Sequence, residues 1–567
     1  MAATTKSQQK RTRNALPKNN KNSGTYVNTV ENGRQSNVPI INLPFTIAEV
    51  DETPLIEDLV SPVWLFQPSS SNNLDGFLNG RLDVDNDDLY VVDQVGLIYV
   101  YRPQIEAARV RATKIDGTSF GLSYEDAENR QVFFEPAWLD VRDKLSKLST
   151  TGADERGLLT AFFHPNDPSR LFLWYSSPHQ VQNNKHHPKE EDEEEFDHDM
   201  VLAEYSVQPA VPLLAGPEPI FGKKISEQFN RTVNRAAIKI KPSTKKPRLV
   251  RELVRWSHPE SNHNGSLVGF SPISPLDSID GTQYLIYLST GDGGGANDQH
   301  GPIGFSQNLN NVWGKMWALD VDNEKRYMVT NEDLRALGLR NLWRGSWLPD
   351  GRHIVGGDVG QDRREGVLVI NAVPFSEEDG ETDVLPPQNF GWRALEMGRI
   401  NDPELFAQLK ARDPEVFGEI RKLPTLWYTH ELGNSVIGGY FVPIYSSSLT
   451  FSGENDADEE DRGVYVYGDW KGDGVWDNIF VSPGTFSPET GELRLDAILR
   501  QPATSRFPGS RSKTNDRPHF IQSFARDNSN NLYVLLTEKA GGLGSHGGQV
   551  RRLHLNTSVL ENNFTFS

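Results

Sequence analysis

A strand-like run, a Gly-rich turn and a second strand-like run recur six times along this chain, and this repetition constrains the fold more than any other feature. The pattern is clear at residues 88–101, DLYVVDQVGLIYVY, and at residues 463–481, GVYVYGDWKGDGVWDNIFV; the other copies cover residues 170–207, 283–321, 353–373 and 531–555. Apolar runs rich in β-branched and aromatic residues, bounded by Gly, Asn and Asp, are typical of strands. Because the copies do not alternate regularly with helices, we predict an all-β, six-bladed β-propeller with long inter-strand insertions.

The copy at residues 283–321 carries the turn TGDGGGAND between its two apolar runs. Three consecutive glycines stand there beside Asp292, Asn297 and Asp298. Because glycine has no Cβ, it suits a backbone that bends tightly and closely approaches another group. The turn is either part of a functional site or an ordinary polar turn.

The first fifty residues differ from the rest and are predicted to form a disordered basic arm. Lys and Arg lie there among Asn, Ser, Thr and Gln, and no acid precedes Glu31. The arm could bind nucleic acid or another acidic surface, or it could be a plain solvated tail. Residues 51–556 would form the propeller and residues 557–567 a C-terminal tail. Acidic stretches at residues 185–199 and 454–461, and a helical segment at residues 403–422, are predicted as peripheral insertions.

Composition excludes several classes of function. Lys plus Arg number 58 against 77 for Asp plus Glu, a formal net charge of −19, which disfavours a body built to grip phosphate backbones. The sequence has no Cys, which excludes disulfides, thiolate metal sites and a Cys nucleophile. Neither an apolar run of about 18 residues nor an apolar signal core occurs. We therefore expect a soluble protein, cytoplasmic by default, for which nucleic acid is an unlikely main partner.

Eight motifs occur in one order along the chain: ERGLLTAFFHPND (155–167), NHNGSLVGF (262–270), STGDGGG with NLNNVWGKMWALDVD (289–322), LRNLWR (339–344), GGDVGQDRREGV (356–367), NFGW (389–392), SVIGGY (435–440) and YGDW (467–470). Together they resemble the soluble glucose/sorbosone dehydrogenase family. This family consists of six-bladed propellers that include PQQ-dependent aldose sugar dehydrogenases and hedgehog-interacting-protein-like proteins. The resemblance covers about residues 63–555, and the independent count of repeats agrees with it.

The resemblance implies a PQQ-dependent, calcium-assisted oxidation of a sugar or related alcohol by hydride transfer, with the electron acceptor unspecified. His263 matches the family's general base, and an imidazole with an ordinary pKa of about 6.5 suits that task. Arg340 would stabilise the quinol oxyanion. The implied cofactor contacts are Glu155, Arg340, Asn341, Trp343 and Lys471, and the implied calcium ligands are the main-chain carbonyls of Gly360 and Gln361.

The chain departs from the family at two positions near its last strands. Two arginines that pair with the cofactor's carboxylates in PQQ enzymes are replaced by Phe520 and Gln522. A tricarboxylate needs such cations, because each charge-assisted bond is worth about 1.5 to 3 kcal/mol. Two other functions therefore stay open. One is a non-catalytic ligand- or protein-binding propeller with a role in assembly. The other is calcium-assisted hydrolysis, for which no clear set of carboxylates is visible.

Each predicted site residue also has an ordinary structural interpretation. His263 could bond to the backbone of a turn, Arg340 could pair between blades, and Lys471 could be a solvated lysine. Trp343 and the other tryptophans could be wedges between blades instead of contacts for a cofactor or a sugar.

Overall fold

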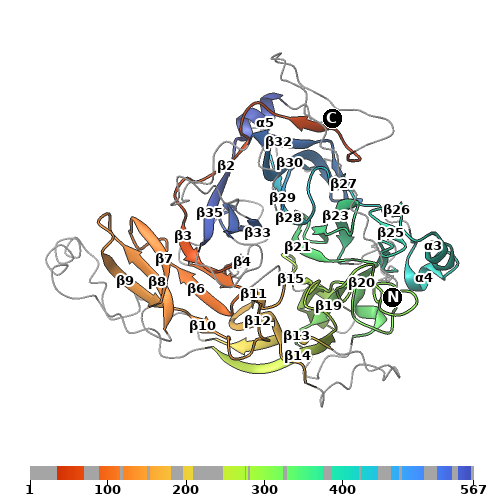
Figure 1. The fold of residues 1–567 in the computed structure, drawn as a ribbon, viewed down its shortest axis with the longest axis horizontal. Coiled ribbons are helices and arrows are strands. Elements are labelled where there is room, and N and C mark those ends of the chain that lie inside the picture. The colour runs from red at the N-terminus through yellow and green to blue at the C-terminus, as the bar shows by residue number, and fades with distance from the viewer. Residues whose placement is uncertain are drawn as a thin grey trace, which may run out of the picture.

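The computed structural model describes residues 35–68, 88–114, 119–149, 154–180, 196–207, 247–274, 276–278, 281–322, 329–373, 386–420, 423–444, 461–470, 476–502, 520–538 and 547–563. Within these ranges 52% of the residues lie in strands and 5% in helices, and the strands form sheets arranged radially around a centre (Figure 1). The predicted all-β class and propeller arrangement are confirmed.

Three sheets come from residues 62–389. The first contains β4 (Pro62–Phe66), β5 (Leu89–Asp93), β6 (Leu97–Tyr101) and β10 (Leu139–Asp140). The second contains β11 (Leu158–His164), β12 (Asp167–Ser177), β13 (His198–Ser206) and β14 (Arg248–His258). The third contains β15 (Ser266–Phe270), β18 (Leu285–Ser289), β19 (Lys315–Asp320), β20 (Leu334–Leu337) and β24 (Gln388–Asn389).

Three further sheets complete the body. The fourth contains β21 (Leu342–Trp347), β22 (His353–Asp358), β23 (Arg364–Asn371) and β27 (Leu426–Thr429). The fifth contains β28 (Val436–Pro443), β29 (Asp461–Asp469), β30 (Trp476–Ser487), β31 (Glu492–Leu495), β32 (Ile498–Pro502) and β1 (Ile40–Asn42). The sixth contains β33 (Phe520–Arg526), β34 (Leu532–Thr537), β35 (Gly548–Leu555), β2 (Ala48–Val50), β3 (Ile56–Leu59), β7 (Arg109–Lys114), β8 (Phe120–Glu125) and β9 (Gln131–Pro136).

The innermost strands contact one another around the centre in the order β4, β11, β15, β21, β28, β33 and back to β4 (Figure 1). Apolar side chains of several strands and loops form the core, in which Trp174, Trp313 and Phe172 are fully buried. Taken as a whole, the arrangement of the strands is that of a five-bladed propeller. The hydrogen bonds between strands, however, define six sheets of four or more strands. The predicted number of six blades therefore remains a prediction.

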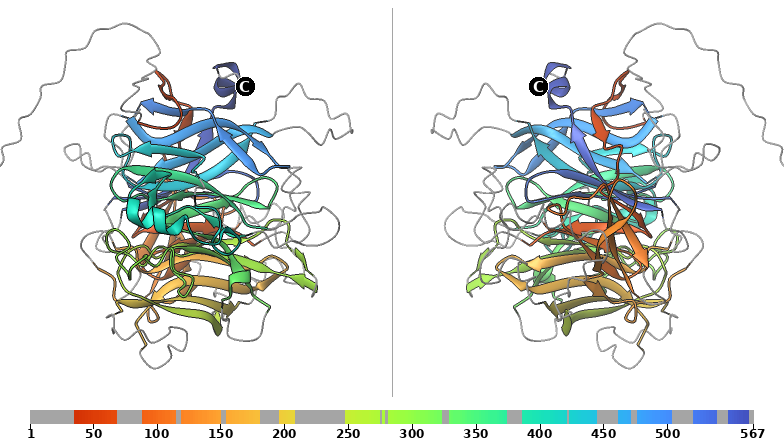
Figure 2. Two further views of the ribbon diagram at one scale, coloured as in Figure 1. Left: turned by 90° about the vertical axis from the view of Figure 1, so that its right-hand side faces the viewer. Right: turned by 90° about the vertical axis from the view of Figure 1, so that its left-hand side faces the viewer.

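Helices and small hairpins lie outside this body. The predicted helical segment at residues 403–422 contains α3 (Pro403–Leu409) and α4 (Pro414–Phe417), and α5 (Thr557–Asn563) stands at the rim (Figure 2). A short 3-10 helix, η1 (Asn331–Asp333), precedes β20. The two hairpins are β16 (Leu276–Ser278) with β17 (Gly281–Gln283), and β25 (Leu395–Glu396) with β26 (Arg399–Ile400). Among the described helices, none has both the length and the apolar composition needed to cross a membrane.

The predicted boundary of the basic arm at residue 50 is wrong. β1 pairs with β32 in parallel and β2 pairs with β35, so residues 40–50 add strands to the fifth and sixth sheets. Their alternation is too short to stand out in sequence, since each strand has only three residues. Residues 1–34 lie outside the described residues. Most of both acidic stretches lies outside them as well, while His198 and Asp199 begin β13 and Asp461 begins β29.

An aspartate at the end of the second strand organises several sheets in the same way. Asp93, Asp358 and Asp469 accept hydrogen bonds from the backbone N–H groups of residues 60–61, 340–341 and 434–435, respectively. Each of these pairs lies just before the innermost strand of the same sheet. A buried carboxylate that satisfies two such N–H groups fixes the loop that enters the strand. In the fourth sheet this loop carries Arg340 and Asn341.

Candidate active site

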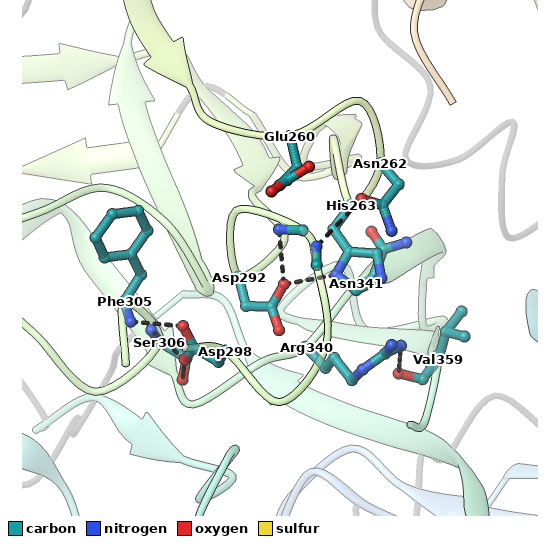
Figure 3. A network of polar contacts seen from close by, with 12 residues as sticks. Glu260, Asn262, His263, Asp292, Asp298, Phe305, Ser306, Arg340, Asn341 and Val359 are labelled. Atoms are coloured by element: carbon teal, nitrogen blue, oxygen red, sulfur yellow. Dashed lines mark hydrogen bonds and ion pairs between the residues drawn. The ribbon is translucent and has the colours of Figure 1, made fainter. Parts of the chain in front are cut away.

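Four of the predicted site residues lie within three residues of the start of an innermost strand. Glu155 precedes β11, His263 precedes β15, and the Arg340–Asn341 pair precedes β21. Asp292 follows β18, the second strand of the third sheet, and lies in the Gly-rich turn singled out above. We call Glu155, His263, Asp292, Arg340 and Asn341 the mouth cluster, because hydrogen bonds join them to one another. Figure 3 shows His263, Asp292, Arg340 and Asn341.

His263 is held in an unusual backbone conformation. Its φ is +62°, a left-handed value that costs an ordinary side chain energy and is often found at functional sites. The turn is fixed by His258, whose Nε2 lies 3.2 Å from the His263 carbonyl oxygen. Gly291 packs against the same carbonyl, since a Cβ at Gly291 would lie 2.1 Å from it. The Gly-rich turn is therefore required for the close approach of β18 to His263.

Asp292 is the partner of His263. Its Oδ1 lies 2.5 Å from His263 Nδ1 and accepts from Gly294 N at 3.0 Å, while its Oδ2 accepts from Trp392 Nε1 at 2.7 Å. Burial raises the pKa of Asp292, but the His263 imidazole and the Arg340 guanidinium outweigh it and hold the pKa below its ordinary value. A carboxylate at this position keeps the proton of the neutral imidazole on Nδ1 and leaves the lone pair on Nε2.

Glu155 links the histidine to Asn341. Its Oε2 accepts from the backbone N–H of His263 at 2.7 Å and from Asn341 Nδ2 at 3.2 Å. The Asn341 side chain is buried, and its Oδ1 has no hydrogen-bond partner among the described residues. An unpaired buried carbonyl oxygen is costly and often marks the place of a ligand donor.

Arg340 lies beside this pair but points away from His263 (Figure 3). Its Nη1 donates to the Val359 carbonyl at 3.0 Å, and its Nε and Nη2 donate to Gln361 Oε1 at 3.3 and 3.2 Å. The Arg340 carbonyl accepts from Asp292 N at 2.8 Å. The guanidinium also lies 5.6 Å from the Trp392 ring centroid, within the range of a cation–π contact. Arg340 and His263 are therefore both joined to Asp292.

The loop that carries the predicted calcium ligands is held by two buried carboxylates. Glu365 accepts from Gly360 N at 3.1 Å, and Glu396 Oε1 accepts from the backbone N–H groups of residues 361–364. Within the described ranges no group of three or more His, Cys, Asp or Glu side chains is placed to hold a metal ion. Calcium at this loop would therefore depend on main-chain carbonyls, as predicted for Gly360 and Gln361.

The remaining predicted cofactor contacts are less accessible. Trp343 is mostly buried, and its Nε1 donates to the Gln522 carbonyl at 3.0 Å, so it packs between β21 and β33. Phe520 packs against Trp470, with ring centroids 4.6 Å apart. Lys471 lies outside the described residues. The two positions that carry arginines in PQQ enzymes therefore hold one aromatic packing contact and one uncharged side chain.

The residues of the mouth cluster can be compared with the groups that PQQ carries, namely a quinone ring and three carboxylates. Arg340 offers a positive charge and N–H donors to the oxygens of a quinone, whereas the open Asn341 Oδ1 is itself an acceptor and can bond only to a donor of the cofactor. The carboxylates of PQQ would have fewer favourable contacts, because Phe520 and Gln522 carry no positive charge and Glu155 adds a negative charge next to His263. The described residues fit the quinone ring better than they fit its carboxylates.

The sequence did not reveal Asp292 as the partner of His263. The two residues are 29 positions apart, and no local spacing rule links a turn before β15 to a turn after β18. In the sequence, Asp292 stands out only as a single acid between an apolar run and three glycines, and this pattern fits an ordinary turn equally well. Trp392, in the NFGW motif, was also not assigned as a donor to that acid.

Comparisons with known proteins find sequence similarity to HIPL proteins and matches to solved structures of sugar dehydrogenases. It is 27% identical to the HIPL1 protein and 28% identical to the HIPL2 protein of Arabidopsis thaliana, over 52% and 50% of this chain. The matches cover 41% and 39% of those proteins, so the chain spans about two fifths of their length. They confirm the resemblance predicted from the motifs. No family model matches the chain.

The solved structures that match the chain include two sugar dehydrogenases. One is the soluble aldose sugar dehydrogenase of Escherichia coli in its apo form, with 12% identity, a TM-score of 0.42, and coverage of 90% of this chain and 100% of that one. The other is the PQQ-bound aldose sugar dehydrogenase of Streptomyces coelicolor, with 14% identity, a TM-score of 0.38, and coverage of 90% and 100%.

Proposed function

We propose that the protein oxidises a sugar or related alcohol at the mouth cluster, with His263 as the general base. The observation that carries this proposal is the His263–Asp292 pair, in which Nδ1 is bound to a carboxylate at 2.5 Å. In the described part of the chain, Nε2 of His263 has no hydrogen-bond partner. An imidazole oriented in this way is ready to accept a proton from a bound hydroxyl group.

The chain's own residues account for the proton-transfer half of the reaction. Asp292 holds the Nδ1 proton and stabilises the imidazolium that forms when Nε2 takes the hydroxyl proton. Trp392 and Gly294 hold Asp292 in place through its two carboxylate oxygens. As His263 takes the hydroxyl proton, the carbon that bears this hydroxyl group gives up a hydride, and the alcohol becomes a carbonyl compound.

PQQ with calcium, which the family resemblance implies, would supply the hydride acceptor and the Lewis acid. Arg340 and Asn341 would contact the quinone, with Trp343, Glu155 and Lys471 as the further predicted contacts. The carbonyls of Gly360 and Gln361 would hold the calcium ion. The loop from Gly360 to Arg364 is suited to this role because Glu365 and Glu396 fix its N–H groups.

We propose that the scaffold has six blades. Six sheets of four or more strands support this number, together with the closed order of contacts from β4 through β11, β15, β21, β28 and β33. The sequence repeat has the same number of copies.

A second candidate is a propeller that binds a ligand or a protein without redox chemistry. Phe520, Gln522 and Glu155 favour it, because together they remove two cations and place one anion where a tricarboxylate cofactor would lie. The two candidates differ in a simple assay. Purified protein is incubated with calcium and PQQ, and dye reduction is measured with a panel of aldoses and related alcohols.

The dehydrogenase proposal predicts substrate-dependent dye reduction that is lost in His263→Ala. The matched control is His554→Ala, since His554 is exposed and pairs with Asp51 far from the mouth cluster. His554→Ala should keep the wild-type unfolding midpoint. His263→Ala should lower it, because it leaves the buried Asp292 carboxylate without the imidazole, so its activity is measured well below its own midpoint. If the wild type binds no quinone and reduces no dye with any substrate of the panel, the dehydrogenase proposal falls and the binding propeller is favoured.

A further inference from the structure

The six innermost strands share an irregularity close to their first residues. Where each of them pairs with the second strand of its sheet, the register shifts across one extra residue, which is a β-bulge. The bulged residues are Val63, Leu159, Val268, Trp343, Ile437 and Gln522. A bulge takes the backbone groups of its extra residue out of the ladder, so these groups need partners elsewhere.

Arg344, which directly follows one of these bulges, binds three of the bulged carbonyls. Its Nη1 donates to Ser266 Oγ at 2.7 Å and to the Trp343 carbonyl at 3.3 Å. Its Nη2 donates to the carbonyls of Val63 at 3.0 Å and Leu159 at 3.3 Å. One guanidinium therefore joins β4, β11, β15 and β21, which follow one another around the centre (Figure 1).

The Arg344 side chain is enclosed by the protein. It is 2% exposed, and its guanidinium lies 5.6 and 4.4 Å from the ring centroids of Trp64 and Trp343. Burial lowers the pKa of Arg344 to about 9, and Glu155 favours the charged form, so the group is a cation at neutral pH. Its Nη N–H groups are already used by the strands. Arg344 is therefore placed to hold strands together and not to contact a ligand.

The strands that Arg344 joins include those that carry the mouth cluster. Glu155 lies just before β11, His263 just before β15 and Asn341 just before β21. Glu155 in turn accepts from the His263 backbone N–H group at 2.7 Å and from Asn341 Nδ2 at 3.2 Å. These two bonds join loops of three different sheets, so they persist only while β11, β15 and β21 keep their separation.

We infer that Arg344 is a positioning residue for the mouth cluster, because its bonds to β11 and β15 from β21 hold Glu155, His263 and Asn341 at a fixed separation. A guanidinium suits this task, since its planar fork of N–H groups reaches acceptors on several strands at once, whereas a lysine ammonium is a compact point charge. The inference rests on the proposed function only in taking the mouth cluster as the active site.

Hydrogen–deuterium exchange followed by mass spectrometry tests the inference without substrate or cofactor. The reporter is the peptide over residues 261–264, in which the His263 N–H group is bonded to Glu155. The reference is the peptide over residues 434–435, whose N–H groups are bonded to a carboxylate of the fifth sheet. Arg344→Lys should speed exchange of the reporter about ten-fold and that of the reference less than about two-fold.

Arg551→Lys is the matched control. Arg551 is also buried and donates to the main-chain carbonyls of Asp51 and Glu52, both at 2.6 Å, but it lies on β35, the third strand of the sixth sheet. Its replacement disturbs bonds of the same kind outside the innermost strands. Exchange of the reporter in Arg551→Lys should therefore stay within about two-fold of the wild type.

Ser266→Ala is a milder variant that serves where Arg344→Lys does not fold. It removes the acceptor that Arg344 binds on β15 and leaves the guanidinium in place. Because only one of the bonds is lost, exchange of the reporter should rise about three-fold. The reporter peptide excludes residue 266, so the substitution does not alter the intrinsic exchange rates within it.

The possible results separate this inference from the proposed function. A rise confined to the reporter in Arg344→Lys supports the inference even where the wild type reduces no dye, a result that would count against the dehydrogenase alone. Unchanged reporter exchange in Arg344→Lys, an equal rise in the reference, or an equal rise in Arg551→Lys would overturn the inference and leave the dehydrogenase standing. Where Arg344→Lys does not fold, unchanged reporter exchange in Ser266→Ala overturns it.

Discussion

Replacing Asp292 by asparagine tests the proposed base most sharply. Asp292→Asn keeps the size of the side chain and an oxygen that can accept from Trp392, but it removes the charge that faces His263 Nδ1 at 2.5 Å. A charge-assisted hydrogen bond is worth about 1.5 to 3 kcal/mol. If about 2 to 3 kcal/mol of it is used to stabilise the imidazolium in the transition state, kcat should fall about 30- to 160-fold.

The assay is dye reduction under saturating substrate, with kcat and KM determined separately. A loss of transition-state stabilisation lowers kcat and leaves KM nearly unchanged. Asp322→Asn is a suitable control, because Asp322 pairs with Arg170 at the outer end of the third sheet. A kcat within about two-fold of the wild type in Asp292→Asn would refute the role assigned to the His263–Asp292 pair.

Three further predictions concern the scaffold and the cofactor. Gly291→Ala places a Cβ 2.1 Å from the His263 carbonyl, so it should lower the free energy of unfolding in urea by more than about 2 kcal/mol; an unchanged urea midpoint would contradict this. Burial raises the pKa of Asp469 to about 6; because this exceeds the unfolded value, its contribution to stability is fully present below about pH 4 and is lost as pH rises through 6. Asp469→Asn should therefore flatten the pH dependence of the unfolding free energy between pH 4 and 6, and an unchanged slope would count against it. Restoring two cations with Phe520→Arg and Gln522→Arg should tighten PQQ binding at least ten-fold in a calorimetric titration; no change in Kd would show that these positions do not face the cofactor.

The sheets were the part of the structure that the sequence predicted well. Each repeat pairs two apolar runs across a polar turn, and this local pattern directly specifies a hairpin such as β5–β6 or β22–β23. The strand, loop and strand predicted at residues 283–321 are found as β18, the Gly-rich turn and β19. Strands of three residues, such as β1 and β2, carry too little pattern to be recognised before their partners are known.

The sequence predicts only those site residues that match a motif of the family. The sequence predicts His263, Arg340, Asn341 and Glu155 as site residues, and the structure joins them to one another and to Asp292. Their partners could not be derived, because each contact joins loops from different sheets and depends on the ring that holds them. The Asp358 carboxylate that fixes the Arg340 loop is an example, since its role becomes visible only beside Asp93 and Asp469.

The protonation of the two His263 ring nitrogens tests the central claim most directly. Nitrogen NMR of protein with labelled histidine, with His263→Asn to assign the signal, distinguishes a protonated nitrogen from one with a free lone pair. The His263–Asp292 pair predicts, above the pKa of the ring, a proton on Nδ1 and a free lone pair on Nε2. A neutral ring with its proton on Nε2, or one that exchanges freely between the two forms, would contradict the assignment of His263 as an oriented base.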